Sequence, residues 1–254
     1  MKQPISRRKL LKASLATAAG ASGMVVAARL ADRYGLIPPD YRGIYGIGET
    51  LTYASQRVLM SYHSLAREFK ESQISTVPIV NGDLPHNEVY ENLLAGGFNA
   101  WRLTVDGLVD RPSSFSIEQL KSLPARTQIT QLACEEGWSF IAKWTGVPLS
   151  EVLNLVGVRP QAKYVVFFTL DKQWWDSLDM PEASHSQTLL AYGMNGSDLP
   201  EGHGAPLRLR VPRQLGYKNL KHLSRITVTD SVKDIGEGLG SVSPEIGYSW
   251  YAGI

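Results

Sequence analysis

The chain of 254 residues contains one cysteine, Cys134, and this single thiol limits how the protein can be stabilised. One cysteine cannot form an internal disulfide, so a hydrophobic core must hold the fold instead of covalent cross-links. Such a core is available, because 43% of the residues are hydrophobic. In an oxidising compartment, the expected use of a thiol without a disulfide partner is as a ligand.

The N-terminus predicts an oxidising compartment. Residues 6–12 read SRRKLLK, which has the pattern of a twin-arginine export signal, and a stretch rich in alanine and glycine follows at residues 13–28. We therefore interpret residues 1–31 as a twin-arginine signal peptide or an N-terminal anchor. The expectation is a periplasmic protein that is exported folded, commonly with a cofactor installed. Membrane association through an uncleaved leader or through a partner is the alternative.

The charge balance argues against nucleic acid as a partner. Residues 1–29 contain six of the 26 Lys and Arg residues and none of the 24 Asp and Glu residues. The rest of the chain therefore has 20 basic and 24 acidic side chains, a net charge of −4, without a stripe of basic residues. Domains that bind nucleic acid are typically basic along one face, so we expect no nucleic-acid partner.

The remaining sequence predicts one domain. Residues 32–48 are rich in glycine and proline and predict an extended lead-in. An amphipathic helix is expected over residues 50–70. Residues 49–254 contain no repeat, low-complexity tract or linker, so we expect a single domain over this range.

Four segments predict β-strands. Residues 164–168 are continuously apolar, as expected for a central strand that is covered on both faces. Alternation of apolar and polar residues predicts strands at 101–105, 207–211 and 226–229, the last two half exposed.

Short helices are expected between the strands. One spans residues 117–123 and is capped by Ser116, and another spans residues 151–156, where Ser150 is the expected cap and Gly157 the left-handed end. Regular crossover helices of the kind that connect parallel strands are missing from the pattern. We therefore expect a mixed α+β domain that is largely β.

Cys134 has three interpretations. As a buried small hydrophobic residue it needs no function. As a nucleophile it needs a histidine base, but none of the five histidines lies near it in the sequence. As a metal ligand it lacks a second cysteine or a closely spaced histidine pair, so the other donors would have to come with a cofactor. The sequence also lacks a haem-attachment motif and an iron–sulfur cysteine set, so we expect neither group in this chain.

A second candidate site lies at residues 191–212, which read AYGMNGSDLPEGHGAPLRLRVP. The glycines and prolines predict a turn that carries His203 and leads into a strand that carries Arg208, with Lys218 and Lys221 shortly after. Arginine supplies paired donors, lysine a point charge, and glycine a close backbone approach, so this cluster can bind a phosphate. A solvated turn with surface cations fits the same residues.

The two segments together resemble the sulfite-oxidase-type molybdopterin oxidoreductase family. Residues 195–212 resemble the signature of that family, and Cys134 stands where the family places its molybdenum-binding cysteine. The run CEEGWS, with WTGVPL after it, is most similar to the bacterial branch of twin-arginine-exported methionine-sulfoxide reductases. The resemblance spans about residues 80–230 and implies the sulfite-oxidase type of molybdopterin-binding fold.

The resemblance also implies a cofactor and its site. Molybdenum would be bound by the Cys134 thiolate and by the two dithiolene sulfurs of a pyranopterin, so Cys134 would be a permanent ligand. The implied cofactor-binding residues are Asn87, Tyr90, Glu91, Thr169, His203, Arg208, Asn219, Leu220 and Lys221. Position 203 is a histidine, as in sulfite oxidases, where the sulfoxide reductases have an amide. Without the resemblance, a helix start would account for Tyr90 and Glu91, and solvation for Lys221.

The residues after Cys134 favour an uncharged substrate. Carboxylates at Glu135 and Glu136 would repel sulfite by about 1 kcal/mol or more each at intermediate dielectric. We therefore expect reduction of an S- or N-oxide with electrons from a membrane haem protein. Sulfite oxidation with a cytochrome as acceptor is the alternative, and Arg102 or Arg126 in the pocket would favour it. A non-catalytic binding protein is a third hypothesis, and the resemblance favours a monomeric catalytic subunit.

Overall fold

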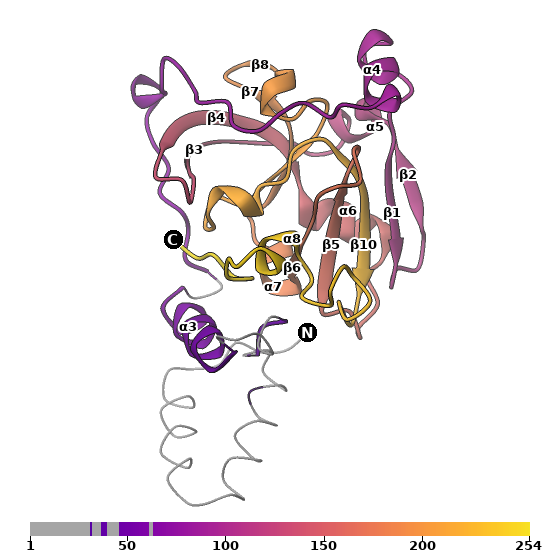
Figure 1. Cartoon of the computed structure of the whole chain (residues 1–254). Coiled ribbons are helices and arrows are strands. Elements are labelled where there is room, and N and C mark those ends of the chain that lie inside the picture. The colour runs from indigo at the N-terminus through magenta and orange to yellow at the C-terminus, as the bar shows by residue number, and fades with distance from the viewer. Residues whose placement is uncertain (1–30, 32–36, 40–45, 61–62) are drawn as a thin grey trace, which may run out of the picture.

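The structure is a computed structural model that describes residue 31 and residues 37–39, 46–60 and 63–254. These residues form two five-stranded β-sheets with short helices around them (Figure 1). The mixed α+β, largely β fold that the sequence predicts is confirmed. The predicted leader at residues 1–31 lies almost entirely outside the described residues.

The first sheet contains one parallel pair of strands. Its order is β2 (Ser113–Phe115), β1 (Leu103–Gly107), β10 (Leu223–Thr229), β5 (Tyr164–Thr169) and β6 (Trp175–Asp179). Strands β1 and β10 run parallel, and the other neighbours are antiparallel. The central strand predicted at residues 164–168 is confirmed as β5, which lies between β10 and β6. The strand predicted at residues 101–105 begins two residues later, at β1.

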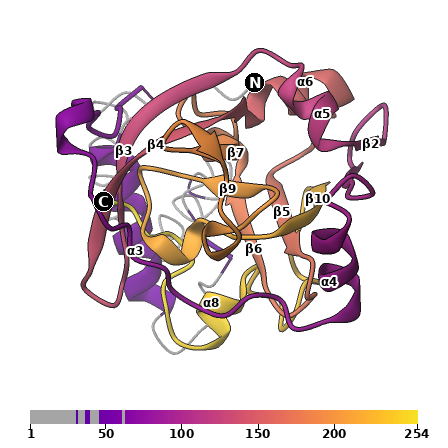
Figure 2. The ribbon, with the colours of Figure 1, turned by 90° about the horizontal axis from the view of Figure 1, so that it is seen from above.

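The second sheet carries the cysteine segment. Its order is β3 (Arg126–Ala133), β4 (Ser139–Pro148), β7 (Leu189–Met194) and β8 (Ser197–Asp198), with β9 (Arg208–Arg210) also paired to β7. All of these pairs are antiparallel. Figure 2 shows β3 and β4 on one side of the molecule, β10 on the other, and β9 between them.

The helices are short and lie around the sheets. They are α3 (Gly46–Leu59), α4 (Glu88–Ala95), α5 (Ile117–Lys121), α6 (Leu149–Val156), α7 (Met180–Ala183) and α8 (Val242–Glu245), with 3₁₀ turns η1 (Glu71–Gln73), η2 (Glu201–His203) and η3 (Gly216–Lys218). Ser116 caps α5 as predicted, because its hydroxyl accepts from the Gln119 backbone N–H at 3.2 Å. The Ser150 cap is wrong: α6 begins at Leu149, which places Ser150 inside its first turn. Gly157 ends α6 with a φ of 71°, as predicted.

One hydrophobic core joins the two sheets. Its buried side chains include Val105, Phe167 and Ile226 from the first sheet and Val147, Leu190 and Leu209 from the second. A smaller cluster around Trp144, Phe140 and Leu132 lies on β3 and β4. The half-exposed strand predicted at 226–229 is confirmed. The half-exposed strand predicted at 207–211 is wrong, because β9 pairs with the buried β7 and all of β9 is buried, Arg210 included.

The first described helix differs from the prediction. It spans Gly46–Leu59 instead of residues 50–70, so the end of the predicted lead-in at residues 32–48 is helical. Residues 64–70, where the prediction continued the helix, are not helical. Glu68 there forms an isolated antiparallel bridge with Thr130 of β3. Within the described chain, no helix is long and apolar enough to cross a membrane.

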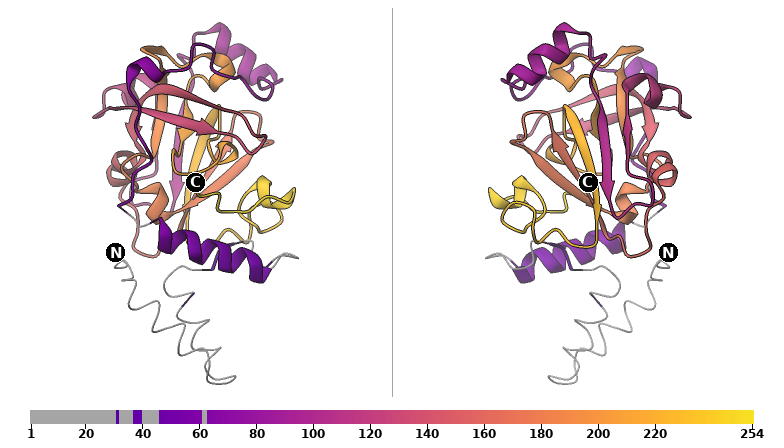
Figure 3. Two further views of the ribbon diagram at one scale, coloured as in Figure 1. Left: turned by 90° about the vertical axis from the view of Figure 1, so that its left-hand side faces the viewer. Right: turned by 90° about the vertical axis from the view of Figure 1, so that its right-hand side faces the viewer.

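Buried ion pairs attach α3 across one end of the sheets (Figure 3). Tyr53 donates to Asp179 Oδ2 at 2.8 Å, and Arg57 pairs with Asp179 and, at 3.5 Å, with Glu182. Arg213 Nη2 pairs with Glu182 Oε2 at 2.6 Å. Burial alone would raise the pKa of Glu182, but the hydrogen bond and charge of Arg213, with the charge of Arg57, outweigh it and lower this pKa from 4.5.

This lowered pKa predicts the acid behaviour of the fold. A carboxyl group whose pKa is lower in the folded state stabilises the fold above its unfolded pKa, and the stabilisation is lost as the pH falls through the folded pKa. Glu182→Gln breaks a buried ion pair, so it should lower the free energy of unfolding at pH 7 by about 3 kcal/mol. The Tm at pH 7 should fall with it. The Tm of Glu182→Gln should also fall less steeply than that of the unmodified protein below pH 4.5. Calorimetry between pH 3 and 7 measures both effects, with the exposed Glu237→Gln as control; parallel curves for Glu182→Gln and the unmodified protein would contradict the assignment.

Candidate functional site

A tight turn after β3 presents the Cys134 thiol. The Cys134 N–H donates to the Trp138 carbonyl at 2.9 Å, and the Gly137 N–H donates to the Cys134 carbonyl at 3.1 Å. Gly137 has a φ of 92°, a conformation that glycine adopts without strain, and the chain reverses there into β4. The turn therefore fixes the thiol at the end of the strand, and its exposed fraction is 8%.

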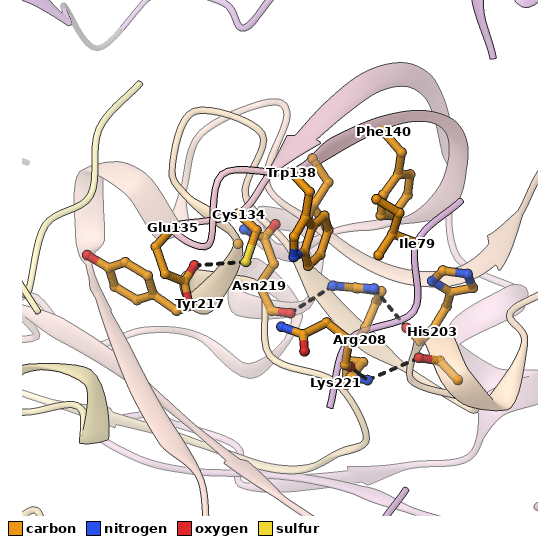
Figure 4. A pocket seen from close by; sticks show the side chains of 14 residues that line it. Ile79, Cys134, Glu135, Trp138, Phe140, His203, Arg208, Tyr217, Asn219 and Lys221 are labelled. Atoms are coloured by element: carbon orange, nitrogen blue, oxygen red, sulfur yellow. Dashed lines mark hydrogen bonds between the residues drawn. The ribbon is translucent and has the colours of Figure 1, made fainter. Parts of the chain in front are cut away.

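The thiol faces a pocket with a cavity volume of about 110 Å³. Figure 4 shows Cys134 and Glu135 on one side and Asn219, Arg208, His203 and Lys221 below and opposite. These residues come from the β3–β4 turn, from η2, from β9 and from the segment after η3. The segment after β9 approaches the thiol closely: a Cβ atom on Gly216 would lie only 3.2 Å from Cys134 Cα.

Arg208 forms the floor of the pocket. Its Nη1 donates to the His203 carbonyl at 2.8 Å and its Nη2 donates to the Asn219 carbonyl at 2.9 Å. Its guanidinium lies 5.0 Å from the ring centroid of Trp144, and its buried Nε has no hydrogen-bond partner. Burial lowers the pKa of Arg208 to about 10, which leaves it protonated at neutral pH.

The charge of Arg208 lowers the pKa of two neighbouring side chains, Lys221 and His203. Lys221 Nζ donates to the carbonyls of Asn81 at 2.5 Å and Gly202 at 3.0 Å. Burial and the charge of Arg208 lower the pKa of Lys221 to about 8. Burial, Arg208 and Lys221 lower the pKa of His203 to about 4, so its imidazole is neutral at pH 7.

The thiol itself has an unfavourable environment for ionisation. Burial raises the pKa of Cys134 to about 11, and the carboxylate of Glu135 adds to this, because Cys134 Sγ donates to Glu135 Oε2 at 3.2 Å. A thiolate nucleophile at neutral pH requires the opposite, a lowered pKa. The geometry therefore does not favour a free catalytic thiolate, and a metal ion would have to displace the proton on binding.

The predicted site residues fall into two groups. Cys134, His203, Arg208, Asn219 and Lys221 line the pocket together, and Leu220 lies buried between two of them. The other four predicted residues, Asn87, Tyr90, Glu91 and Thr169, do not line it.

Those four residues have local partners instead. Asn87 caps α4 by accepting from the Tyr90 N–H at 2.8 Å, and Glu91 is exposed. Thr169 donates to Asp171 Oδ1 at 2.5 Å. Of the four, Tyr90 lies near a neighbour of the pocket. Its ring packs edge-on against His222, at 5.1 Å between ring centroids, and His222 is the residue that follows Lys221 in the sequence. The hydroxyl of Tyr90 and Nε2 of His222 are buried without hydrogen-bond partners.

The residues present fit a molybdenum–pterin group. Arg208 and Lys221 have no carboxylate within ion-pair distance in the described part of the chain. A buried arginine and a half-buried lysine without carboxylates, with the Nε of Arg208 unpaired, suit the phosphate of a pterin. The described residues contain no cluster of three or more His, Cys, Asp or Glu side chains that could hold a metal ion. The single thiolate therefore suits a metal whose other donors arrive with the cofactor.

Comparison with known proteins decides the family. Residues 90–235 match the oxidoreductase molybdopterin binding domain. The chain belongs to this family. It is a molybdenum-dependent oxidoreductase of the sulfite-oxidase type, as the sequence predicts.

Two curated relatives of this molybdopterin oxidoreductase are sulfoxide reductases by name. A protein from Azospira oryzae named "Putative protein-methionine-sulfoxide reductase subunit YedZ1" is 37% identical over 195 residues, 77% of this chain and 70% of the relative. The protein-methionine-sulfoxide reductase catalytic subunit MsrP from Xanthomonas campestris pv. campestris is 39% identical over 149 residues, 53% of this chain and 46% of the relative. The match therefore spans about half the length of this catalytic subunit.

A solved structure shares part of the fold. The sulfane dehydrogenase SoxCD from Paracoccus pantotrophus superimposes with a TM-score of 0.50 and 28% identity over 52% of this chain and 39% of that chain. In this oxidoreductase family, Cys134 would bind the metal, while Arg208 and Lys221 would hold the anionic end of the pterin.

Several residues that line the pocket were not among the predicted site residues. Glu135 and Trp138 follow Cys134 within four residues, so their place in the same turn could have predicted them as pocket residues. Tyr217 was signalled only by its place between Arg208 and Asn219. Ile79 and Asn81 had no signal, because the extended segment that brings them to the pocket is far from Cys134 in sequence.

The single thiol predicts a sharp loss of cofactor chemistry. Cys134→Ser replaces a soft sulfur donor with a hard oxygen donor, so the molybdenum-linked visible absorption and turnover should both be abolished. Absorption spectra and metal analysis of the purified protein measure the change. Normal activity in Cys134→Ser would refute the ligand assignment.

Proposed function

We propose that this oxidoreductase reduces sulfoxide-type substrates in the periplasm, with electrons from a membrane haem protein. Reduction of a sulfoxide consumes two electrons and two protons and releases the sulfide and water. When bound, the molybdenum–pterin group supplies the oxygen-atom transfer. The names of two relatives as protein-methionine-sulfoxide reductases support the substrate class.

The charge of the pocket is the observation that carries this proposal. Glu135 brings a carboxylate to the pocket beside the thiol, 3.2 Å from Sγ. The cations that line the pocket, Arg208 and Lys221, lie across it from Glu135, where they would bind the anionic end of the pterin. A dianion at the thiol would therefore meet a carboxylate without a guanidinium fork to bind it, whereas a neutral sulfoxide meets no such repulsion.

The arginines that would favour sulfite lie elsewhere. Arg102 donates to the carbonyls of Asn99 and Trp101, and Arg126 pairs with Glu68 at 3.1 Å. Neither lines the pocket. Glu136 does not line the pocket, and its Oε2 accepts from Trp138 Nε1 at 2.7 Å. Glu135 is thus the carboxylate that acts on a substrate at the thiol.

The neutral ring of His203 adds a polar wall without adding charge. Its side chain packs edge-on against Phe140, at 5.7 Å between ring centroids, and its pKa of about 4 keeps it uncharged at pH 7. Trp138, Phe140 and Ile79 give the same pocket an apolar side. An apolar wall opposite neutral polar groups suits the thioether chain and S=O group of a sulfoxide.

The proposed location and partner depend on the leader and on the relatives. The twin-arginine pattern at residues 6–12 supports export of the folded, cofactor-loaded protein. One relative is named as a subunit and another as a catalytic subunit, which supports a separate electron-carrying partner.

A second candidate is oxidation of a sulfur compound with a cytochrome as acceptor. The partial likeness to a sulfane dehydrogenase is the observation that favours it. The carboxylate of Glu135 opposes it for anionic substrates such as sulfite.

Assays of the purified holoprotein test the proposal. With a reduced viologen dye as electron donor, the protein should oxidise the dye when methionine sulfoxide is added. Sulfite with cytochrome c as acceptor should give little turnover, because the pocket repels the dianion. A higher kcat/KM with sulfite than with methionine sulfoxide would overturn the proposed direction.

Glu135 should determine this preference. Glu135→Gln removes the carboxylate at the thiol, so the KM for sulfite should fall by roughly fivefold, equivalent to about 1 kcal/mol of removed repulsion. The KM for methionine sulfoxide should stay within about twofold, since a neutral substrate gains little. Glu136→Gln is the matched control, because that carboxylate is bound to Trp138. Equal KM changes for sulfite in both variants would contradict the role of Glu135.

A further inference from the structure

Arg210 is a fully buried arginine beside the pocket that the family resemblance does not assign. Its exposed fraction is 0%, and its guanidinium lies 5.4 Å from the ring centroid of Trp144, the ring that also contacts Arg208. Its Nη1 donates to Asn219 Oδ1 at 2.7 Å. Its Nη2 donates to Thr130 Oγ1 at 3.2 Å and to the Gln131 carbonyl.

Fold stability does not explain this burial. Arg210 has no carboxylate within ion-pair distance in the part of the chain that the structure describes, and its Nε has no hydrogen-bond partner. Burial and the like charge of Arg208 lower its pKa from the ordinary value. Burial of a charge without an opposite charge beside it costs free energy of folding. Arg213 differs, because its buried guanidinium pairs with Glu182.

The contacts of Arg210 connect the two walls of the pocket. One arm of its guanidinium holds β3 at Thr130 and Gln131, just before the strand delivers Cys134. The other arm holds the side chain of Asn219, whose backbone carbonyl accepts from Arg208. Asn219 also accepts from the Val211 N–H at 2.7 Å, which fixes its amide next to β9.

We infer that Arg210 is a positioning residue that sets the thiol of Cys134 against the cationic wall of Arg208 and Lys221 for binding of the molybdenum–pterin group. The planar fork is essential to this role, since a single point charge cannot hold β3 and Asn219 in a fixed relation. The inference depends on cofactor binding, which the family establishes, and is independent of the proposed sulfoxide substrate.

Two substitutions separate the fork from the charge. Arg210→Met keeps an unbranched side chain but removes every donor and the charge, whereas Arg210→Lys keeps the charge and loses the fork. Thr130→Val removes one acceptor of the fork, and Arg225→Met removes an exposed arginine as the matched control. Each protein is purified from the same host, and molybdenum and pterin are measured per folded protein, with the Tm and the Mo(V) electron paramagnetic resonance signal.

The expected result is loss of cofactor without loss of fold. Arg210→Met should keep a Tm near that of the cofactor-free unmodified protein, while its molybdenum and pterin content falls about 10-fold. Arg210→Lys should show a similar deficit, and any molybdenum that remains should give an altered resonance signal. The molybdenum and pterin content of Thr130→Val should also fall, but by less than that of Arg210→Met. Arg225→Met should have the same content as the unmodified protein.

Other results would overturn the inference. Full recovery of molybdenum and of the resonance signal in Arg210→Lys would show that charge alone suffices. Unchanged cofactor content in Arg210→Met, or a fall in Tm that accounts for all of the cofactor lost, would show that Arg210 only supports the fold. Should Arg210→Met fail to fold, the same two criteria apply to Arg210→Lys and Thr130→Val. Failure of the sulfoxide assay with full cofactor in the unmodified protein would refute the substrate proposal alone.

Discussion

Two arginines buried on the same tryptophan are the constraint on which the site depends. Arg208 and Arg210 both lie against the ring of Trp144 and both lack a carboxylate among the described residues. Burying a charge is costly, and here backbone carbonyls and one aromatic face provide the compensation. Among the described residues no carboxylate pairs with either arginine, and the resulting positive potential fits a bound anionic cofactor.

The topology explains why the thiol and the cations meet. Strand β9 pairs with β7, and β7 pairs with β4, whose other neighbour is β3. In this order β3 and β9 lie on opposite sides of the β4–β7 pair, and hydrogen bonds from Arg210 of β9 to Thr130 and Gln131 of β3 connect them, so that Cys134 and Arg208 line one pocket although they are far apart in sequence. Gly216 allows the closest approach, because any side chain there would press on Cys134.

Charge on the two sides of the pocket differs in sign. The Cys134 side carries Glu135, and the opposite side carries Arg208 and Lys221. This distribution of charge fits a cofactor with an anionic end, bound at the cationic side, and a reactive end that meets a neutral molecule at the Cys134 side. The same division suits an anionic pterin at one end and the neutral substrate that we propose at the other, since the two ends of the pocket impose opposite electrostatic preferences.

The sequence by itself determined the family and four of the strands, β1, β5, β9 and β10. The lone Cys134, the signature around Arg208 and the apolar run of β5 are local patterns, and local patterns can be read without coordinates. Only the tertiary structure decided that Arg210 is buried, that Glu135 faces the thiol while Glu136 does not, and that Asn87 and Thr169 lie outside the pocket. These facts depend on which distant strands pair and which way a turn directs each side chain, and alternation along one strand carries no information about either.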